Sequence, residues 1–451
     1  MARRSGGLRF QPSGGARKVS VPTGKKQALG IERLADDGRG IAFFEGHTWF
    51  VTGALPGESV QARVLGTRGQ VVEARLERVL ESSPQRREEP CPWARQCGGC
   101  SLQHIDHVDQ LALKEKALAS HLQRIANLTP DEWAPPLAGP AFEYRRRARV
   151  AVRWSEAAQA LEVGFRESSS QAIVDVDDCL VLVPTLRPIL NSLSAVLGAL
   201  EDPRAIGHVE LFQGDASVVL VRHTRPLGGA DLAALHAFCK SHDAQLWLQG
   251  KGEPVQADGE IGLSYTLASQ HLRLGYRPGD FIQVNAAVND AMVDQALDWL
   301  GPLEGLQVLD LFSGLGNFSL PLAQRAHRVV GVEGSGEMVA RARVNAEQNG
   351  LDNVHFFEAD LSKPLPDSPW ARHAYDVIVL DPPRDGAFAV VQEARSWSAN
   401  RVLYVSCNPA TLARDAAELS KYGYQLVRAG AMDMFPQTAH VEAMALFERE
   451  R

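Results

Sequence analysis

The chain has 451 residues, of which 22% are charged and 45% hydrophobic, and its formal net charge is −7. This length exceeds what one ordinary core can fill and predicts about three domains, while the usual hydrophobic share excludes a fibrous protein and a chain disordered throughout. No apolar run approaches the ~18–20 residues of a membrane-spanning helix, and the basic start lacks the apolar core of a secretory signal, so the expected location is the cytoplasm.

Positive charge is concentrated at the beginning of the chain, despite the negative total. The first 26 residues contain seven lysines and arginines and no acidic residue. We therefore predict that residues 1–22 form a basic flexible tail. Such a tail either contacts phosphates, because their neutralisation releases counterions, or only helps to keep the chain in solution.

The pattern of residues 23–84 predicts a small OB-like β-barrel. Short apolar runs at 41–44, 48–51 and 59–64 alternate with turns, a spacing that is typical of a barrel. Five arginines and four aromatic residues could form a surface that binds phosphates and stacks bases, although most of the aromatics are expected in the core. These residues are Arg33, Arg39, Arg63, Arg68, Arg75, Phe43, Phe44, Trp49 and Phe50.

Four cysteines have the spacing of a site for a metal ion or an iron–sulfur cluster. Cys91, Cys97 and Cys100 follow one another in a glycine-containing stretch, and Cys179 comes later, after three aspartates. Glycines between the ligands let the chain wrap around a small inorganic centre. Disulfides are not expected in a chain without an export signal, and the spacing alone leaves zinc and an iron–sulfur cluster open.

These cysteines belong to a predicted central α+β domain, residues 85–274. Within it, the stretch 104–128 has apolar residues at helical spacing, and we expect it to form a helix that packs on the catalytic domain. The apolar residues are Leu111, Ala112, Leu118, Leu122 and Ile125. Alternating strands and two further helices are expected between about 141 and 274.

Residues 275–451 repeat the order strand, glycine turn, helix. This order predicts a Rossmann-like α/β domain built on a doubly wound parallel sheet. A hydrophobic strand at 308–311 runs into a turn with Gly314 and Gly316. Glycines here let a ligand approach the backbone at the carboxyl end of the first strand.

Acidic residues after the next two strands indicate which ligand binds there. Glu333 ends the second strand and is placed to bind ribose hydroxyls, and Asp360 ends the third and could meet an adenine amino group. No third glycine follows Gly316 at the spacing of a dinucleotide site. The pattern therefore favours S-adenosylmethionine over NAD as the cofactor.

Two later strands end in residues suited to chemistry. The strand at 375–380 ends at Asp381, and two prolines after it make a rigid turn that holds a polar group at the sheet's open edge. Arg384 follows, where amino-group methyltransferases have an aromatic residue, so a different target atom is expected. The strand at 401–405 leads to Cys407, and a helix opens just after it. Because a helix N-terminus lowers a thiol's pKa, we interpret Cys407 as a nucleophile.

Methylation of a pyrimidine at C5 needs such a thiolate. C5 is a poor nucleophile towards a methylsulfonium group, and addition of a thiolate at C6 turns C5 into an enolate-like carbon. C5 then carries both hydrogen and methyl, so a base must remove the proton before the thiolate leaves. Glu442 is the candidate base, with a proton affinity raised by an apolar pocket, and His440 is the alternative.

Together these stretches resemble the signatures of the RNA uracil-C5-methyltransferase family. They run in the family's order and the match covers nearly the whole chain. The matching stretches are 281–285, 310–314, 381–384, 406–409 and 440–442. The barrel resembles the family's TRAM RNA-binding domain, and Cys91, Cys97, Cys100 and Cys179 match its [4Fe-4S] ligands.

The resemblance implies a role for each matching residue. Cys407 corresponds to the nucleophile and Glu442 to the proton-abstracting base, acting on a uridine flipped out of the RNA. The implied contacts to S-adenosylmethionine are Gln283, Phe312, Asn317, Glu333, Asp360 and Asp381, and Asp381 is also implied to hydrogen-bond the target base. The implied [4Fe-4S] cluster is expected to be structural, since no step of the mechanism requires an electron.

In having both a barrel and the four cysteines, the chain resembles the bacterial members of the family that act on uridine 1939 of 23S ribosomal RNA. We therefore expect 23S ribosomal RNA as the partner of a monomer that binds no membrane. Four arginines within 145–149 suit contact with RNA, and a solvated edge strand is the alternative. The same chemistry on transfer RNA or another ribosomal uridine, a cytosine-C5 enzyme, and a non-catalytic RNA-binding assembly factor are the rival functions.

Overall fold

The structure is a computed structural model that describes residues 21–168, 170–257, 262–363, 368 and 370–449. The predicted basic tail, residues 1–22, lies almost entirely outside the described residues. The chain divides into two compact units, Met1–Arg86 and Arg87–Arg451. In the described part of the chain, no helix is long and apolar enough to cross a membrane.

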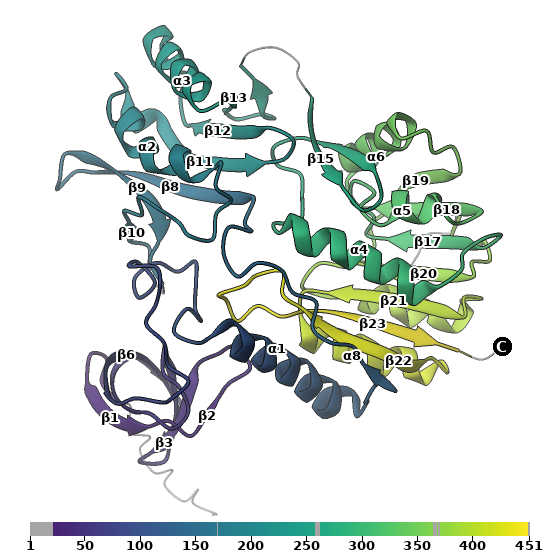
Figure 1. The fold of residues 1–451 in the computed structure, drawn as a ribbon, viewed down its shortest axis with the longest axis horizontal. Coiled ribbons are helices and arrows are strands. Elements are labelled where there is room, and N and C mark those ends of the chain that lie inside the picture. Colours follow the sequence, from purple (N-terminus) through teal and green to yellow (C-terminus); the bar gives the residue numbers. More distant parts are fainter. Residues whose placement is uncertain (1–20, 169, 258–261, 364–367, 369, 450–451) are drawn as a thin grey trace, which may run out of the picture. The chain divides into compact units, whose positions relative to one another are not determined.

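The first unit is a six-stranded sheet that curls into a small barrel (Figure 1). Its strands, in the order in which they pair, are β1 (Lys26–Gly30), β5 (Ser59–Arg68), β6 (Val71–Glu81), β4 (His47–Thr52), β3 (Gly40–Phe44) and β2 (Arg33–Leu34). Inward-facing residues such as Val51, Val60 and Val72 form one apolar core, because side chains alternate between the two faces of a strand. The predicted barrel is confirmed.

The aromatic residues of the barrel are divided between its core and its surface. Trp49 is buried in the core, whereas Phe43 is 53% exposed. The guanidinium of Arg39 lies 4.7 Å from the centre of the Phe50 ring. Phe43 and Phe50 are therefore the aromatics available for a surface role. Trp49 lies in the core and Phe44 packs partly buried against it, so the expectation that most of the four aromatics lie in the core is only partly correct.

The second unit begins with the irregular cysteine-bearing stretch, followed by helices. These are α1 (His107–His121) and the π-helix η1 (Leu122–Ala126), and the short strand β7 (Glu132–Trp133) comes next. The predicted helix at 104–128 is therefore confirmed, but its predicted apolar face is partly wrong. Ala112 and Ile125 are exposed, whereas Gln110 and Lys114 are buried. The reason is that this face meets polar partners, which are described below.

The central region contains a seven-stranded sheet and two α-helices, as expected. The strands pair in the order β10 (Ile173–Val174), β9 (Ala160–Arg166), β8 (Arg147–Ser155), β11 (Ile206–Gln213), β12 (Ser217–His223), β13 (Ala244–Gln249) and β14 (Val255–Gln256). The helices are α2 (Arg187–Gly198), the 3-10 turn η2 (Pro203–Ala205) and α3 (Gly229–Ser241). Leucines at helical spacing on α2, including Leu193 and Leu197, pack against the sheet in one core.

A hairpin of β15 (Leu263–Leu267) and β16 (Leu272–Tyr276) precedes the last sheet. That eight-stranded sheet has the order β19 (Val354–Glu358), β18 (Arg328–Glu333), β17 (Gln307–Leu311), β20 (Val377–Leu380), β21 (Arg401–Ser406), β23 (Glu442–Glu448), β22 (Gln425–Met432) and β7. Its helices are α4 (Ala286–Leu300), α5 (Ser319–Ala323), α6 (Gly336–Gln348), α7 (Phe388–Val391), the 3-10 turn η3 (Gln392–Ser396) and α8 (Pro409–Lys421).

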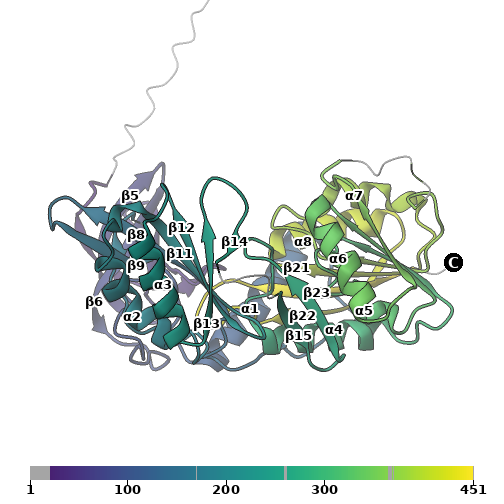
Figure 2. The ribbon, with the colours of Figure 1, turned by 90° about the horizontal axis from the view of Figure 1, so that it is seen from above.

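Helices cover both faces of this sheet. Successive residues of β17, Val308 and Leu309, belong to two different apolar cores, one on each face. Helix α5 contributes to the first core and α7 to the second, and Figure 2 shows them on opposite sides of the strands. Helix α1 lies along α8 and β22 in Figure 1, where Leu118 joins the second core.

The predicted parallel sheet is correct for five strands and wrong for β23. β19, β18, β17, β20 and β21 are parallel, whereas β23 runs antiparallel to both β21 and β22. No helix separates β22 from β23: residues 433–441 connect them directly, as antiparallel neighbours allow. β23 therefore begins at the edge where β21 ends, and this arrangement determines the geometry of the site.

Candidate functional site

Cys407 and Glu442 lie beside each other because of this antiparallel pairing. Ser406, the last residue of β21, pairs with Ala443 of β23, so the residue after Ser406 and the residue before Ala443 come opposite each other. Asp381 directly follows β20, the parallel neighbour of β21. The charges of Glu442 and Asp381 both influence the Cys407 thiol, so the structure brings these three predicted residues together.

Both carboxyl groups favour their protonated form. Burial raises the pKa of Asp381 to about 7. Burial and then the charge of Asp381 raise the pKa of Glu442 to about 8, against the opposing effect of Lys114. A carboxyl group with a pKa near neutrality can both take up and release a proton. The expectation that Glu442 has a raised proton affinity is thus confirmed.

The expectation that Cys407 has a lowered pKa is wrong. Helix α8 does begin just after it, at Pro409, with Asn408 as its N-cap. Burial, Glu442 and Asp381 nevertheless raise the pKa of the Cys407 thiol to about 11, against the opposing effects of Arg384 and of a main-chain hydrogen bond. Burial of the thiol first, and the two neighbouring acidic groups second, therefore outweigh any effect of the helix terminus, because both disfavour the charged thiolate.

Arg384 links the loop after β20 to the alternative base, His440. An Nη2 atom of Arg384 lies 3.2 Å from Nδ1 of His440. The main-chain oxygen of Arg384 accepts a hydrogen bond of 3.0 Å from the Asn408 side chain. Burial and then the charge of Arg384 lower the pKa of His440, so its imidazole is an uncharged acceptor for the guanidinium. This contact occupies one ring nitrogen of His440 and favours Glu442 as the base.

The glycine turn after β17 has an unusual backbone and unsatisfied polar atoms. Phe312 has φ of +68°, and Gly314 and Gly316 have φ of +54° and +96°; a positive φ is costly for a residue other than glycine and marks functional sites. The buried Oδ1 of Asp310 and Oγ of Ser313 have no hydrogen-bond partner. Such orphaned atoms call for a polar ligand. Neither residue was predicted from the sequence as a contact, although both belong to the matching stretch 310–314.

Glu333 and Asp360 follow the two strands beyond this turn. The Glu333 carboxylate accepts hydrogen bonds from the main-chain nitrogens of Gly314, at 3.2 Å, and Ser335, at 3.0 Å. Glu333 is therefore tied to the glycine turn itself. Asp360 is exposed, and hydrogen bonds from Lys363 and Ser362 lower its pKa to about 2.

Asn317 directly follows Gly316 of the turn, and Gln283 lies in the chain just before α4. The Asn317 side chain exchanges hydrogen bonds of 2.9 and 3.0 Å with Asn289 of α4 and accepts one of 3.2 Å from Tyr265. Gln283 is buried, and its main-chain oxygen accepts a hydrogen bond of 2.6 Å from Arg146. The structure thus holds Asn317 firmly at the site.

The four predicted cysteine ligands are near one another in the second unit. The charges of Cys91, Cys97 and Cys179 all affect the Cys100 thiol, and burial first and these charges next raise its pKa to about 12. Among the described residues, however, no group of three or more side chains is arranged closely enough to hold a metal ion. The thiols therefore lie near one another but are not arranged as metal ligands in this part of the structure.

The basic stretch 145–149 is less available to RNA than its composition suggests. Arg146 is buried, and its guanidinium lies 4.7 Å from the Tyr265 ring. Arg147 pairs with Glu210 at 3.0 Å. Tyr144 is also buried. Of the four arginines, Arg149 is the one classed as exposed.

A cavity of about 530 Å³ lies away from these residues. It is lined by residues that include Tyr375, Trp397 and Ser398, which precede β20 and β21. The predicted site residues follow the carboxyl ends of the strands, so this cavity belongs to the other end of the sheet and is not part of the candidate site.

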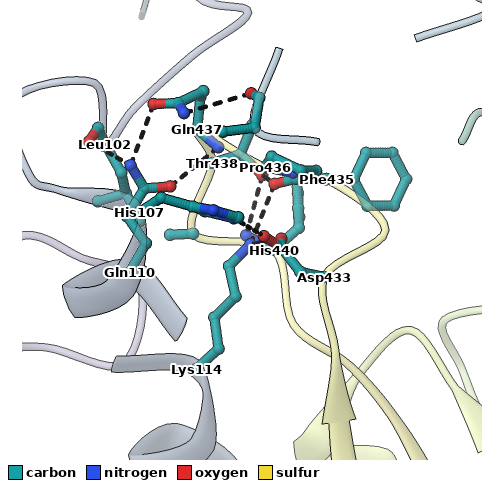
Figure 3. A network of polar contacts seen from close by, with 12 residues as sticks. Leu102, His107, Gln110, Lys114, Asp433, Phe435, Pro436, Gln437, Thr438 and His440 are labelled. Carbon is teal, nitrogen blue, oxygen red and sulfur yellow. Dashed lines mark hydrogen bonds and ion pairs between the residues drawn. The ribbon is translucent and has the colours of Figure 1, made fainter. Parts of the chain in front are cut away.

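A polar network around residues 433–441, between β22 and β23, was not predicted from the sequence. Asp433 and Gln437 are fully buried there and bond to Lys114 and Gln110 of α1 (Figure 3). The spacing of His107, Gln110 and Lys114 places three polar side chains on one helix face, but such a face normally indicates exposure to solvent, so this pattern alone does not identify the network.

Two regions of the chain match known protein families. Residues 106–450 match the tRNA (Uracil-5-)-methyltransferase family, and residues 21–76 match the TRAM domain. A 23S rRNA (uracil(1939)-C(5))-methyltransferase of Pseudomonas aeruginosa (strain UCBPP-PA14) is 61% identical over 448 residues, covering 99% of this chain and 100% of the relative. The protein of that name from Pseudomonas syringae pv. tomato (strain DC3000) is 60% identical, covering 99% of each.

A solved structure resembles this fold over nearly its whole length. It is the Pyrococcus abyssi tRNA (uracil-54, C5)-methyltransferase in complex with S-adenosyl-L-homocysteine, with a TM-score of 0.71 and 25% identity. The likeness covers 93% of this chain and 100% of that one.

Proposed function

The chain belongs to the tRNA (uracil-5-)-methyltransferase family, and from this premise we propose that it methylates C5 of uridine 1939 in 23S ribosomal RNA. Two relatives named for that reaction are 60–61% identical over almost the full length of both chains. The single observation that carries the chemistry is the position of the Cys407 thiol beside the carboxyl groups of Glu442 and Asp381.

S-adenosylmethionine is the methyl donor in this proposal, and the glycine turn suits it. The orphaned oxygens of Asp310 and Ser313 and the positive φ of Gly314 leave a polar, closely approachable backbone. Glu333 is bound to this turn and is assigned to the ribose hydroxyls. The other assigned contacts are Gln283, Phe312, Asn317, Asp360 and Asp381. The similar Pyrococcus structure contains the demethylated product of this donor.

The proposed reaction begins at Cys407. Cys407 reacts as the thiolate, after its thiol proton has passed to solvent. The sulfur forms a bond to C6 of the uracil, and the electron pair of the C5–C6 double bond moves toward C5 and O4. C5 then takes the methyl group as the sulfonium–methyl bond breaks and S-adenosylhomocysteine is released. Arg384 favours the thiolate, since its charge lowers the pKa of Cys407.

Glu442 completes the reaction. Its carboxylate removes the proton from C5, the C5–C6 double bond re-forms, and the C6–S bond breaks to return the Cys407 thiolate. Its position opposite Cys407 in the β21–β23 ladder supports this role. A base whose pKa is raised by burial also has the proton affinity that the step requires.

We also propose that Cys91, Cys97, Cys100 and Cys179 hold a [4Fe-4S] cluster. Four buried or half-buried thiols that repel one another as thiolates suit a cationic centre with soft sulfur ligands. Main-chain nitrogens donate to these sulfurs, as from Gly99 to Cys97 at 3.4 Å. The cluster would link the stretch that contains Cys91, Cys97 and Cys100 to the later part of the central domain that contains Cys179. Zinc is the alternative, and analysis of the metal and of acid-labile sulfide would distinguish the two.

The RNA partner is assigned to the TRAM barrel and to exposed positive charge. Phe43 is exposed, and Arg39 stacks over the Phe50 ring, which suits unpaired bases and phosphates. Arg149 adds a charge in the central domain. We further propose that a monomer acts on the RNA.

The test combines unmodified 23S ribosomal RNA or transfer RNA with methyl-labelled S-adenosylmethionine, followed by mapping of the labelled nucleotide. Label at C5 of uridine 1939 alone is the expected result. Label in transfer RNA would keep the mechanism but contradict the substrate. No transfer to either RNA by folded protein would favour a non-catalytic RNA-binding factor.

A further inference from the structure

The nine residues 433–441 connect β22 to β23 and lead directly into Glu442. We refer to them as the base loop. Most of its first six residues are buried: Asp433, Met434, Pro436, Gln437 and Thr438 are all inaccessible to solvent or nearly so, and Phe435 is half-buried. Because a buried loop must find partners for its polar main-chain atoms, the question is which part of the protein supplies them.

A buried lysine of α1 supplies the first set of partners. Lys114 is 1% exposed, and its Nζ donates hydrogen bonds of 2.5 Å to Asp433 and 3.0 Å to the main-chain oxygen of Phe435. The second carboxylate oxygen of Asp433 lies 2.7 Å from Nε2 of His107. Burial alone raises the pKa of Asp433, but His107 and Lys114 outweigh it and lower the pKa, so Asp433 is held as the carboxylate. Burial lowers the pKa of Lys114, and Asp433 opposes that shift.

Gln437 is the second point of attachment. It has φ of +66° and no exposed surface, a conformation that costs a residue other than glycine ~1–3 kcal/mol unless its surroundings hold it. Gln110 holds it twice: Oε1 accepts from the Gln437 main-chain nitrogen at 2.9 Å, and Nε2 donates to the Gln437 side chain at 3.0 Å. Figure 3 shows Gln110 and Lys114 reaching the base loop from one face of α1.

The chain after Cys100 supplies the third set. The main-chain oxygen of Gln437 accepts hydrogen bonds from the nitrogens of Ser101 and Leu102, at 2.9 and 3.0 Å. The Ser101 hydroxyl accepts one from Ala439 at 3.1 Å, and the Tyr144 hydroxyl donates one of 2.9 Å to the oxygen of Pro436. The base loop is thus held by residues more than 290 positions earlier in the chain.

We propose that Lys114 and Gln110 are positioning residues for the base, which fix the base loop so that Glu442 can remove the C5 proton. This inference rests on the proposed function. Cys407 and Asp381 follow β21 and β20, whose hydrogen bonds to neighbouring strands hold them. Glu442 instead begins its strand, so its main chain is fixed on one side by β23 and on the other by the base loop.

A specific consequence follows, because the base acts only after the covalent bond to Cys407 has formed. Loosening the base loop should slow proton removal more than thiol addition or methyl transfer. The methylated, covalent RNA–protein adduct should then accumulate, whereas general loss of folded protein would lower adduct and product together. The ratio of adduct to released product is therefore a readout that a purely structural role does not move.

The experiment measures this ratio in single turnover with methyl-labelled S-adenosylmethionine and unmodified 23S ribosomal RNA. Protein-bound label on a denaturing gel reports the adduct, and free labelled RNA reports the product. The variants are Lys114→Met, Gln110→Met and the double variant Lys114→Met with Asp433→Asn, which leaves no unpaired buried charge. Displacement of a reacting group by about 1 Å can lower a rate by a factor of ~10². In these variants the release of methylated RNA should therefore slow about 10- to 100-fold, while the covalent adduct persists.

Two controls distinguish positioning from stability. Asp231→Asn changes another buried carboxylate, which accepts hydrogen bonds from the nitrogens of Glu201 and Asp202 in the central domain, at 2.6 and 3.3 Å. It should leave the ratio of adduct to product unchanged. Lys114→Arg, which keeps the charge, should restore part of the release rate. If Lys114→Met does not fold, Gln110→Met, which alters no charge, still tests the proposal.

The outcomes separate the two claims. Accumulated adduct in the Lys114 and Gln110 variants, with an unchanged ratio for Asp231→Asn, supports the inference. Active wild-type protein whose variants lose adduct and product in equal measure would overturn the inference alone. A wild-type protein that methylates neither RNA would overturn the proposed function, and the inference with it.

Discussion

The candidate site has two halves that the fold builds in different ways. Asp310, Asp381 and Cys407 lie in or directly after strands of the sheet, and each is fixed by the strand that carries it. Glu442 begins β23 after the base loop, which is held by side chains of α1 and by the chain after Cys100. Short-range strand and turn geometry therefore determines the first half, and contacts between distant parts of the chain determine the second.

This difference implies a division of labour. The half made of strand ends carries the groups for covalent bond formation and methyl transfer. These steps need the Cys407 thiol, the methyl donor and the target uracil in one place. The half made by the base loop carries proton removal. Changes in the two halves should therefore stop the reaction at different points.

The largest effect is expected from Cys407→Ala. Without the sulfur no bond to C6 forms, so methylation should fall by more than about 10⁴-fold. Labelled RNA product and protein-bound label on a denaturing gel are the measurements. Both should be absent, although RNA binding persists. Retained methylation would contradict the nucleophile and remove the distinction between the halves.

A smaller and qualitatively different loss is expected from Glu442→Gln. The amide cannot accept the C5 proton, and loss of a general base typically costs about 10²–10⁴-fold in rate. The adduct should form and remain, so protein-bound methyl label should exceed released product. If His440 were the base, His440→Ala would trap the adduct and Glu442→Gln would not.

The same two halves differ in how far the sequence could predict them. Strand, glycine turn and acid recur in order along residues 308–333, so the end of each parallel strand and its polar residue could be located from local pattern alone. The position of Cys407 at the end of β21 followed in the same way. Its raised pKa did not, because the effect comes first from burial of the thiol and then from Glu442 and Asp381, which belong to other parts of the sheet.

The second half could not be predicted from local pattern. Gln110 and Lys114 are polar residues in a helix, and polarity normally indicates an exposed face. Their burial depends on partners in the base loop, more than 310 residues away along the chain. The antiparallel course of β23, which places Glu442 opposite Cys407, likewise depends on pairing and not on the residues of that strand alone.

The charge of Lys114 gives a further test through pH. It opposes the burial and the Asp381 charge that raise the pKa of Glu442, so its removal in Lys114→Met should raise that pKa further. Proton removal needs the carboxylate form, and the acid limb of the rate of RNA release should therefore move to higher pH. Below the limb the rate falls about tenfold per pH unit. The acid limb should shift little in Lys114→Arg. If the limb did not shift in Lys114→Met either, Lys114 would position the base loop without affecting the pKa of Glu442.

The raised pKa of Glu442 also predicts an effect on stability. The pKa is about 8 in the folded protein and 4.5 for an ordinary glutamate, so the folded state holds the proton more tightly than the unfolded state. The contribution to stability is complete below pH 4.5 and is lost as the pH rises to about 8, at ~1.4 kcal/mol per unit. Glu442→Gln, which cannot ionise, should therefore melt at a higher temperature than the wild type at pH 8.5 and at nearly the same temperature at pH 4.5. Equal melting curves at both values would show that Glu442 is not buried in this way.

The smallest effect is expected outside both halves. Arg149 is exposed on β8, and a single phosphate contact contributes about 1 kcal/mol, so Arg149→Ala should weaken RNA binding several-fold and reduce its salt dependence by about one counterion. Arg153→Ala is a matched control, because the Arg153 guanidinium is already paired with Glu162 at 2.6 Å. Neither variant should change the ratio of adduct to product. A shift of that ratio in Arg149→Ala would mean that RNA docking and the base loop are coupled, and that the two halves of the site do not act separately.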